Sequence, residues 1–428
     1  MKEGDSVEKL EKIDKEFSFQ AVPLEYRKSF LQILAVMVAL TFFSASMWAG
    51  GTLGVGLTFS QFLFIVLAGN FILGLYTGAL AYIAAKTGLS THLLTRYSFG
   101  EKGSYLSSLM LGFTQVGWFG VGVAMFALPV QKVTGVNVYI LIVISGILMT
   151  LTAIYGIKAL ALLGMVAVPA ILILGSISVF RATETAGGIE GLFAYEPTEM
   201  IGFAAALAIC IGSFISAGTL TPDFVRFANT SKSAVTATVI AFFLGNSLMF
   251  LFGAVGAIAF GVADISDVMV LQGLIIPAVI VLGLNIWTTN ENALYASSLG
   301  FANITKLPRN AMVVFNGTVG TLLALWLYNH FTDYLTLLSS TLPCIGAIVL
   351  VDYFLLNKGK YRAYEAMTFK EINWVAIVAW IVGALAGNFG PGIAPINALL
   401  GAAIVYYAGM IFVERSNKEK EKVDERIG

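Results

Sequence analysis

Charged side chains are scarce in this chain. Asp, Glu, Lys and Arg make up 12% of its 428 residues, and 58% of the residues are hydrophobic. An ordinary soluble protein carries roughly 25% charged residues. A soluble chain of this length could not bury so much apolar surface, so the composition excludes a soluble globular protein and indicates a membrane protein. The formal net charge of +0 also gives no electrostatic basis for binding nucleic acid.

Cysteine and histidine are almost absent. The two cysteines, Cys210 and Cys344, both lie in apolar stretches, so no disulfide framework is indicated. The two histidines, His92 and His330, fall in predicted loops, and no histidine relay is visible. Zinc-ligand spacing, a Gly-rich phosphate loop and a nucleophile elbow are all missing. We therefore expect a protein that is not an enzyme and holds no organic cofactor.

Long apolar runs, by contrast, recur along the whole chain. A transmembrane helix needs about 20 mostly apolar residues. Twelve stretches qualify: 29–56, 60–86, 103–131, 136–156, 159–181, 199–220, 234–262, 268–297, 311–328, 332–354, 372–388 and 393–413. The first 28 residues carry both charges and lack a cleavable signal pattern, so we expect a solvated leader that stays attached.

The positive charges of the loops predict the orientation. If both termini are cytoplasmic, the inner loops hold twelve Lys and Arg residues and the outer loops hold only Lys132 and Arg181. Cytoplasmic loops carry an excess of Lys and Arg in membrane proteins. The strict alternation supports the number of spans and the orientation together. We expect a multi-pass membrane protein with both termini cytoplasmic.

Two of the stretches share a short internal echo. Phe43–Leu53 reads FSASMWAGGTL and Phe214–Leu220 reads FISAGTL, and the second is surrounded by Gly, Ser, Thr and Pro residues from Gly212 to Pro222. Such residues weaken a helix, and a broken helix survives in lipid only where protein or a wet cavity pairs its backbone. Five helices separate the two motifs, which is typical of an inverted five-helix repeat whose first helices are discontinuous. A chance match of small residues at helix interfaces is the alternative.

Two aromatic positions are candidates for binding a flat ligand. Phe214 lies in the predicted break between Ser213 and Ser216, where its ring can stack on a planar molecule. Gln115 and Trp118 are three residues apart and share one helical face, so they can form an edge and a wall of the same site. The alternatives are a packed or lipid-facing Phe and an interhelical hydrogen bond without a ligand.

The densest polar patch of any span is Asn285–Asn292. Asn285, Thr288 and Thr289 share a face through their i, i+3, i+4 spacing. The carbonyl of Asn285 and the two hydroxyls supply three neutral oxygens. The carbonyls of Phe43 and Ser46 at the first break would complete a five-oxygen site for a monovalent cation such as Na⁺.

Two asparagines and a carboxyl group of this patch can serve a substrate or a proton. Asn285 and Asn290 can each offer an acceptor and two donors to a ligand. Glu291 is a possible proton carrier, which would make the protein H⁺-coupled, and it can equally face a cavity or pair with a base. This patch therefore predicts function but leaves the coupling ion open.

Four segments carry a family resemblance: Thr41–Trp48, Thr114–Phe126, Gly212–Leu220 and Leu282–Asn290. They resemble bacterial members of the nucleobase–cation symporter family 1, and the similarity extends from about residue 35 to 410. The resemblance implies an all-α fold with a five-plus-five inverted repeat, discontinuous first and sixth helices and two additional C-terminal helices. The expected organisation is a cytoplasmic leader (1–28), a ten-helix core (29–354), a loop with two helices (355–413) and a cytoplasmic tail (414–428).

The resemblance also implies a function. Cytosine would be imported together with Na⁺ by alternating access, by a protein that acts as a monomer. The base would lie between Trp118 and Phe214 and be read by Gln115, Ser213, Ser216, Asn285 and Asn290. Na⁺ would bind to Phe43, Ser46, Asn285, Thr288 and Thr289. A proton-coupled permease for another planar nucleobase or a hydantoin-like substrate is the alternative, and a non-transporting receptor is a second one.

Overall fold

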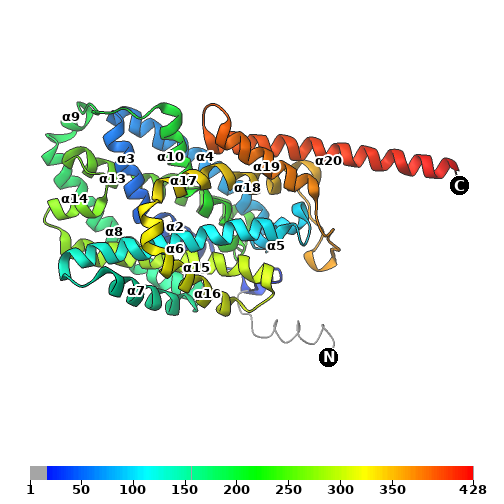
Figure 1. Cartoon of the computed structure of the whole chain (residues 1–428), viewed down its shortest axis with the longest axis horizontal. Helices are drawn as coiled ribbons and strands as arrows, with labels where there is room; N and C mark the ends of the chain where they lie inside the picture. The colour runs from blue at the N-terminus through cyan, green and yellow to red at the C-terminus, as the bar shows by residue number, and fades with distance from the viewer. Residues whose placement is uncertain (1–16, 156, 428) are drawn as a thin grey trace.

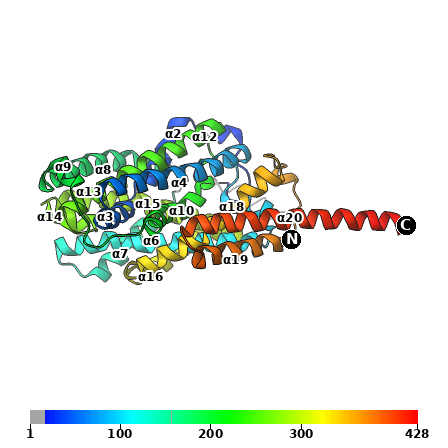
Figure 2. The same ribbon diagram turned by 90° about the horizontal axis from the view of Figure 1, so that it is seen from above.

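The computed structural model describes residues 17–155 and 157–427, and this part of the chain is almost entirely helical. Its one β contact is an isolated parallel bridge between Lys28 and Ala228. The helices lie side by side in one bundle, from which α20 (Ala394–Ile427) projects at the C-terminal end (Figures 1 and 2). The other long helices are α4 (Phe59–Thr87), α6 (Ser104–Thr134), α8 (Ile157–Thr185), α15 (Ile275–Thr305) and α16 (Arg309–Asn329).

Hydropathy supports the predicted spans. In the described part of the chain, seven helices are long and apolar enough to cross a membrane, and the bent pair α2 (Phe30–Thr41) and α3 (Ser44–Gly56) makes an eighth. Shorter apolar helices are α7 (Val138–Ala153), α10 (Phe203–Thr219) and α19 (Trp374–Phe389). With α15, which carries the polar patch, each of the twelve predicted stretches contains a helix.

The first span is broken where the sequence predicted a discontinuity. α2 and α3 meet at an angle of 51°. Phe42 and Phe43 leave helical geometry, with φ/ψ of −80°/81° and −124°/131°, and Phe43 is the N-cap of α3. The break leaves carbonyls at the end of α2 and N–H groups at the start of α3 that need partners from elsewhere in the protein.

The sixth span is interrupted later than the composition suggested. α10 is helical through Gly212–Gly218, and the interruption falls at Leu220, before α11 (Thr221–Val225). Ser213 donates to Cys210 O (2.9 Å) and Thr219 to Ile215 O (2.8 Å), so these hydroxyls bond to their own helix. The prediction that Phe214 lies in the break is therefore wrong, because its neighbours are satisfied within a continuous helix.

The eighth span also begins later than predicted. Residues 265–271 form the separate helix α14 (Ile265–Leu271), and α15 starts only at Ile275. Gly273 between them has φ of +71°, a left-handed conformation that favours glycine and ends α14. The apolar run near Val268 therefore belongs to a short helix and not to the span.

The helices pack in two groups around the centre of the bundle. α6, α7, α15 and α16 contact one another, and α2, α3, α4 and α10 pack with α12 (Ser231–Ile240) and α13 (Ser247–Phe260), which a π-helical turn joins (η2, Ala241–Asn246). The tenth span is divided at Leu342 into α17 (Phe331–Thr341) and α18 (Pro343–Val351), which ends in a π turn (η3, Asp352–Leu356). Short helices precede α6 and α15 at matching places, α5 (Thr91–Phe99) and α14, as an internal repeat requires.

Candidate functional site

A pocket opens where the broken first span, α6, α10 and α15 meet. Its space measures about 380 Å³ including the open side. Leu40 and Phe43 line it from the first span, and Ala217 and Ala293 line it from α10 and α15. The other lining residues are Gln115, Trp118, Ser213, Phe214, Ser216, Thr289, Asn290 and Asn292. The structure thus brings together all the predicted substrate residues except Asn285.

Two aromatic rings form walls of the pocket. Trp118 is 6% exposed, and its indole N–H donates to Ser216 Oγ at 2.9 Å, which links α6 to α10. Phe43 and Tyr334 meet the indole edge-on, with ring centroids 5.5 and 5.7 Å away. Phe214 is buried against Phe242 in an edge contact at 5.3 Å. These contacts fix the orientation of both rings, which suits them to a flat ligand.

Tyr334 is a member of this site that the sequence did not reveal. It lies on α17, and its hydroxyl donates to the backbone carbonyl of Thr114 on α6. Its ring packs edge-on against Trp118, and its hydroxyl joins the tenth span to the third. No local motif marks it, because its partner is 220 residues away in the sequence.

The three amides of the pocket differ in their hydrogen bonds. Asn290 donates to Phe119 O (3.2 Å) and to Met149 Sδ (3.2 Å). Gln115 is 5% exposed, and its Nε2 has no partner in the described part of the chain. Asn292 is 3% exposed, and neither of its amide atoms has a partner there. We did not select Asn292 from the sequence, although it follows Thr289 by three residues and so shares its face.

Asn285 lies at the break of the first span and not in the pocket lining. Its Nδ2 donates to Phe42 O, and its Oδ1 accepts from Ser44 N (2.9 Å) and Ser44 Oγ (2.7 Å). Phe42 O belongs to the end of α2, and Ser44 N belongs to the first turn of α3. One amide therefore caps both helix ends and holds the break against α15, which uses both lone pairs of its Oδ1 and one of its two N–H groups.

The oxygens proposed for a cation lie on α15 and at the break of the first span, where Asn285 joins the two. Thr289 Oγ1 donates to Asn285 O (3.0 Å) and Thr288 Oγ1 to Leu284 O (2.9 Å), so both hydroxyls keep lone pairs for another partner. Phe43 O accepts from Ser46 N at 3.0 Å. Ser46 Oγ is buried without a partner among the described residues. A set of neutral, under-used oxygens fits a hard monovalent cation such as Na⁺.

Glu291 is buried outside the pocket. It is 1% exposed, and its carboxyl group lies beside Thr152 and Trp287. It follows Trp287 by four residues on α15, and Trp287 donates to Thr152 Oγ1 on α7 at 2.9 Å. The carboxyl group therefore lies on the α7 side of α15. Glu291 is not among the residues that line the pocket, so the structure does not indicate that it contacts a substrate there.

A second polar cluster joins α5 to α11. His92 is buried on α5, and its Nε2 lies 3.6 Å from Asp223 Oδ2, while Asp223 Oδ1 accepts from Thr91 N at 2.7 Å. Arg226 donates to the backbone oxygen of Asp223 at 3.3 Å. The carboxylate of Asp223 therefore faces His92 and the start of α5.

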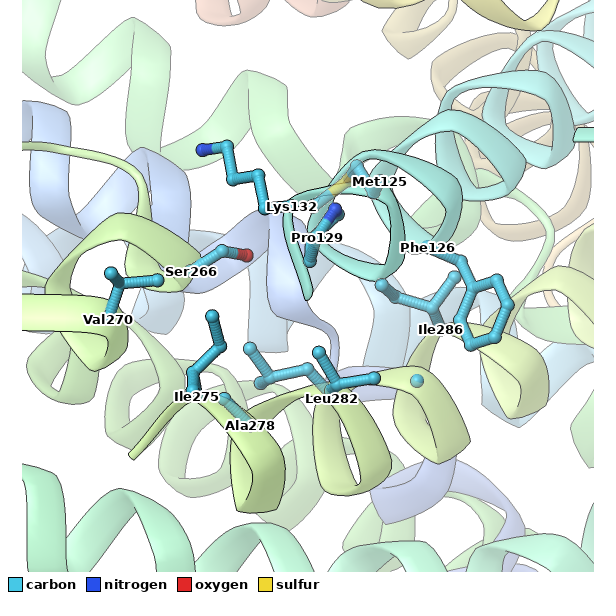
Figure 3. A pocket seen from close by; sticks show the side chains of 12 residues that line it. Met125, Phe126, Pro129, Lys132, Ser266, Val270, Ile275, Ala278, Leu282 and Ile286 are labelled. Atoms are coloured by element: carbon cyan, nitrogen blue, oxygen red, sulfur yellow. The ribbon is translucent and has the colours of Figure 1, made fainter. Parts of the chain in front are cut away.

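Another pocket of about 380 Å³ lies between α6, α14 and α15, near the Lys132 end of α6 (Figure 3). Hydrocarbon side chains such as Leu282 and Ile286 make up most of its lining, and Ser266 and Lys132 are its polar side chains. Lys132 is already bonded to Asp267 at 2.5 Å. This pocket lacks amides to read a polar edge, so the pocket at Trp118 is the better candidate for a planar polar ligand.

Comparison with known proteins supports the family resemblance. Residues 21–409 match the family described as permeases for cytosine/purines, uracil, thiamine and allantoin. The cytosine permease of Escherichia coli (strain K12) is 56% identical over 393 residues, which cover 92% of this chain and 94% of the relative. The hydantoin permease of Microbacterium maritypicum is 22% identical over 374 residues, covering 78% of this chain and 76% of the relative.

The fold is also found among solved structures. The closed, bromovinylhydantoin-bound structure of Mhp1, a nucleobase-cation-symport-1 family transporter, matches with a TM-score of 0.82 at 22% identity. The match covers 93% of this chain and 96% of Mhp1. It confirms the predicted all-α transporter fold. Because the family match covers nearly the whole helical bundle, the chain belongs to the permeases for cytosine/purines, uracil, thiamine and allantoin, which are membrane transporters and not enzymes.

Proposed function

We propose that the protein imports cytosine together with Na⁺ by alternating access. The observation that carries this proposal is the pocket at Trp118, where two fixed aromatic rings meet amides with unused hydrogen-bonding groups. Stacking rings suit a planar molecule, and free donors and acceptors suit its polar edge. The 56% identity to a bacterial cytosine permease favours cytosine over other planar bases.

Na⁺ is the coupling ion that the chemistry of α15 favours. The oxygens around Asn285, Thr288 and Thr289 are neutral, and Asn285 joins them to the broken first span. An ion that binds there would stabilise one arrangement of that span against α15. It can drive uptake only by binding more tightly in one conformation than in the other. We place the protein in a bacterial inner membrane, as a monomer with both termini cytoplasmic.

A proton-coupled permease is the second candidate, and Glu291 is the observation that favours it. A carboxyl group buried within a membrane span is a proton-binding group by its chemistry. In that case the gradient that drives uptake would be one of pH, and Glu291 would carry the proton.

Uptake of radiolabelled cytosine into proteoliposomes distinguishes these possibilities. Accumulation under an inward Na⁺ gradient at equal pH, and none under a proton gradient in Na⁺-free buffer, is the expected result. Accumulation under the proton gradient alone would refute Na⁺ coupling. Competition by unlabelled uracil, adenine and hydantoin tests the substrate, and a competitor that displaces label better than cytosine would refute the assignment of cytosine.

A further inference from the structure

Asn292 has an unusual environment for a membrane-buried amide. It is 3% exposed, it lines the pocket, and its Oδ1 and Nδ2 both lack a partner among the residues that the structure describes. Buried polar side-chain atoms in proteins almost always have a hydrogen-bond partner, because leaving one unpaired is costly. A buried amide with both ends unused therefore needs an explanation, and a missing ligand provides one.

The other asparagines of α15 show that its environment is not generally poor in partners. Asn285 caps the break of the first span, and Asn290 donates to α6 and α7. Asn303 donates to Ser108 Oγ (2.9 Å) and accepts from Arg96 Nε (3.1 Å). All three are as buried as Asn292. Asn292 differs from them only in facing the pocket without a protein partner.

A second unpaired amide lines the same pocket, about one helical turn away from the level of Asn292. α6 and α15 run antiparallel, since Asn303 contacts Ser108 and Asn290 contacts Phe119. In this register, Asn292 on α15 stands opposite Trp118 on α6, and Gln115 lies about one helical turn nearer to Ser104. Gln115 also lines the pocket, and its Nε2 is buried without a partner in the described ranges. Two unused amides thus line one pocket from neighbouring helices.

The position of this pair relative to the rings defines what it can read. Gln115 precedes Trp118 by three residues on α6, and Asn292 follows Thr289 by three on α15. A rise of about 1.5 Å per residue places Gln115 about 4.5 Å from the level of Trp118, on the Ser104 side, while Asn292 lies at the level of Trp118 itself. Because both amides line the pocket that contains the indole, a base stacked on Trp118 lies within the same space as both of them.

We propose that Asn292 is the specificity-determining residue for the amino edge of the base. Its Oδ1 would accept from the 4-amino group of cytosine and its Nδ2 would donate to N3, while Gln115 Nε2 would donate to O2. An asparagine pairs with the amino group and ring nitrogen of adenine through the same donor and acceptor pattern. The assignment rests on the proposed function, since it takes cytosine as the ligand.

The test compares cytosine with pyrimidin-2-one, which is the same ring without the 4-amino group. Affinities of both are measured for the purified full-length protein in Na⁺ buffer, by displacement of radiolabelled cytosine. For the wild type, losing the amino group should weaken binding roughly 10- to 100-fold, because Oδ1 is then left unpaired. In Asn292→Leu, cytosine should lose a similar factor, and the ratio of the two affinities should fall close to one.

The unfolding temperature of the ligand-free protein provides a second readout. Asn292→Leu removes two unpaired polar atoms, so its midpoint should equal or exceed that of the wild type. Asn303→Leu is the matched control, because its amide is bonded to Ser108 and Arg96. It should unfold at a lower temperature and keep the wild-type ratio of affinities. Asn292→Ala serves the same purpose if the leucine variant does not fold.

Each outcome decides one of the two proposals. Wild-type protein that binds neither ring would refute the proposed function, and this assignment with it. Wild-type protein that binds cytosine, together with an Asn292→Leu or Asn292→Ala variant that keeps the wild-type ratio, would overturn the assignment alone. A fall in the ligand-free midpoint of Asn292→Leu as large as that of Asn303→Leu would show a structural role instead.

Discussion

Replacing Asn285 by alanine should loosen the break of the first span, and the size of the effect follows from its contacts. The side chain makes three hydrogen bonds, one to Phe42 O and two from Ser44. Phe42 and Ser44 are 4% and 1% exposed, so water cannot replace the lost amide without opening the interface. Each buried group left unpaired costs about 1–3 kcal/mol, and partial relaxation should bring the total to about 3–5 kcal/mol.

Thermal unfolding of the detergent-solubilised protein measures this loss, with cytosine binding measured in parallel. Ser44→Ala is a graded control, because it removes only the bond from Ser44 Oγ and should cost about 1 kcal/mol. Asn285→Ala should unfold well below Ser44→Ala and bind cytosine weakly, since Phe43 and the α15 wall of the pocket then lose their fixed spacing. An Asn285→Ala protein with wild-type stability and no cytosine binding would refute this reasoning and place Asn285 in contact with the base.

Three further predictions concern the ring, the ion and pH. Trp118→Ala should abolish cytosine binding in a folded protein, and retention of wild-type affinity in a binding assay would remove the indole from the site. Replacing both Thr288 and Thr289 by alanine should abolish the Na⁺ dependence of uptake in proteoliposomes, and unchanged Na⁺ dependence would place the ion elsewhere. Burial raises the pKa of Asp264, the N-cap of α14, so the wild type should lose stability as pH rises from about 4. Asn is as good an N-cap as Asp, so the Asp264→Asn variant should unfold at a higher temperature than the wild type at neutral pH and at no higher temperature near pH 4. If the variant and the wild type had equal unfolding midpoints at both pH values, this prediction would be contradicted.

The positions of the spans could be predicted because the bilayer imposes a simple requirement on the chain. Each span needs a long apolar stretch, and the twelve stretches found on this basis all contain helices. The start of α15 was misplaced because hydropathy does not separate a span from a short apolar helix before it. Only the left-handed Gly273 marks that boundary, and its conformation depends on the turn.

The break of the sixth span could not be located from composition. Gly, Ser and Thr weaken a helix only when their backbone or hydroxyl groups have better partners outside it. In α10 the hydroxyls of Ser213 and Thr219 bond to their own helix, and the bonds of Thr219 to Tyr76 and of Ser216 to Trp118 form without interrupting it. Gly212 and Gly218 instead allow close packing, since an added Cβ would lie 2.9 Å from Ser339 Cβ and 3.1 Å from Thr77 Cγ2. The same residue types therefore serve helix packing here and not a discontinuity.

The polar patch of α15 illustrates a different limit. Helical spacing groups its residues by face, but it does not tell which face meets the pocket. Asn285 was predicted to bind substrate, and it bonds instead to Ser44, which is 241 residues away in the sequence. Asn292 was passed over, and it lines the pocket unpaired. The partners of an amide are decided by tertiary packing, so a sequence pattern can mark a functional helix without assigning each of its side chains.

The position of Asn285 gives the proposed coupling a physical route. Its side chain caps α2 and α3, while its backbone carbonyl accepts from Thr289, a residue of both the pocket and the proposed ion site. A cation bound to these oxygens would favour the arrangement in which the break is held against α15. That arrangement also sets the distance between Phe43 and Trp118, whose rings are in edge contact at 5.5 Å. Ion and base would then stabilise the same state of one interface, and each would strengthen the binding of the other to the same extent. Such coupling needs no direct contact between the ion and the base, because both stabilise the same contact of Asn285 with the broken first span.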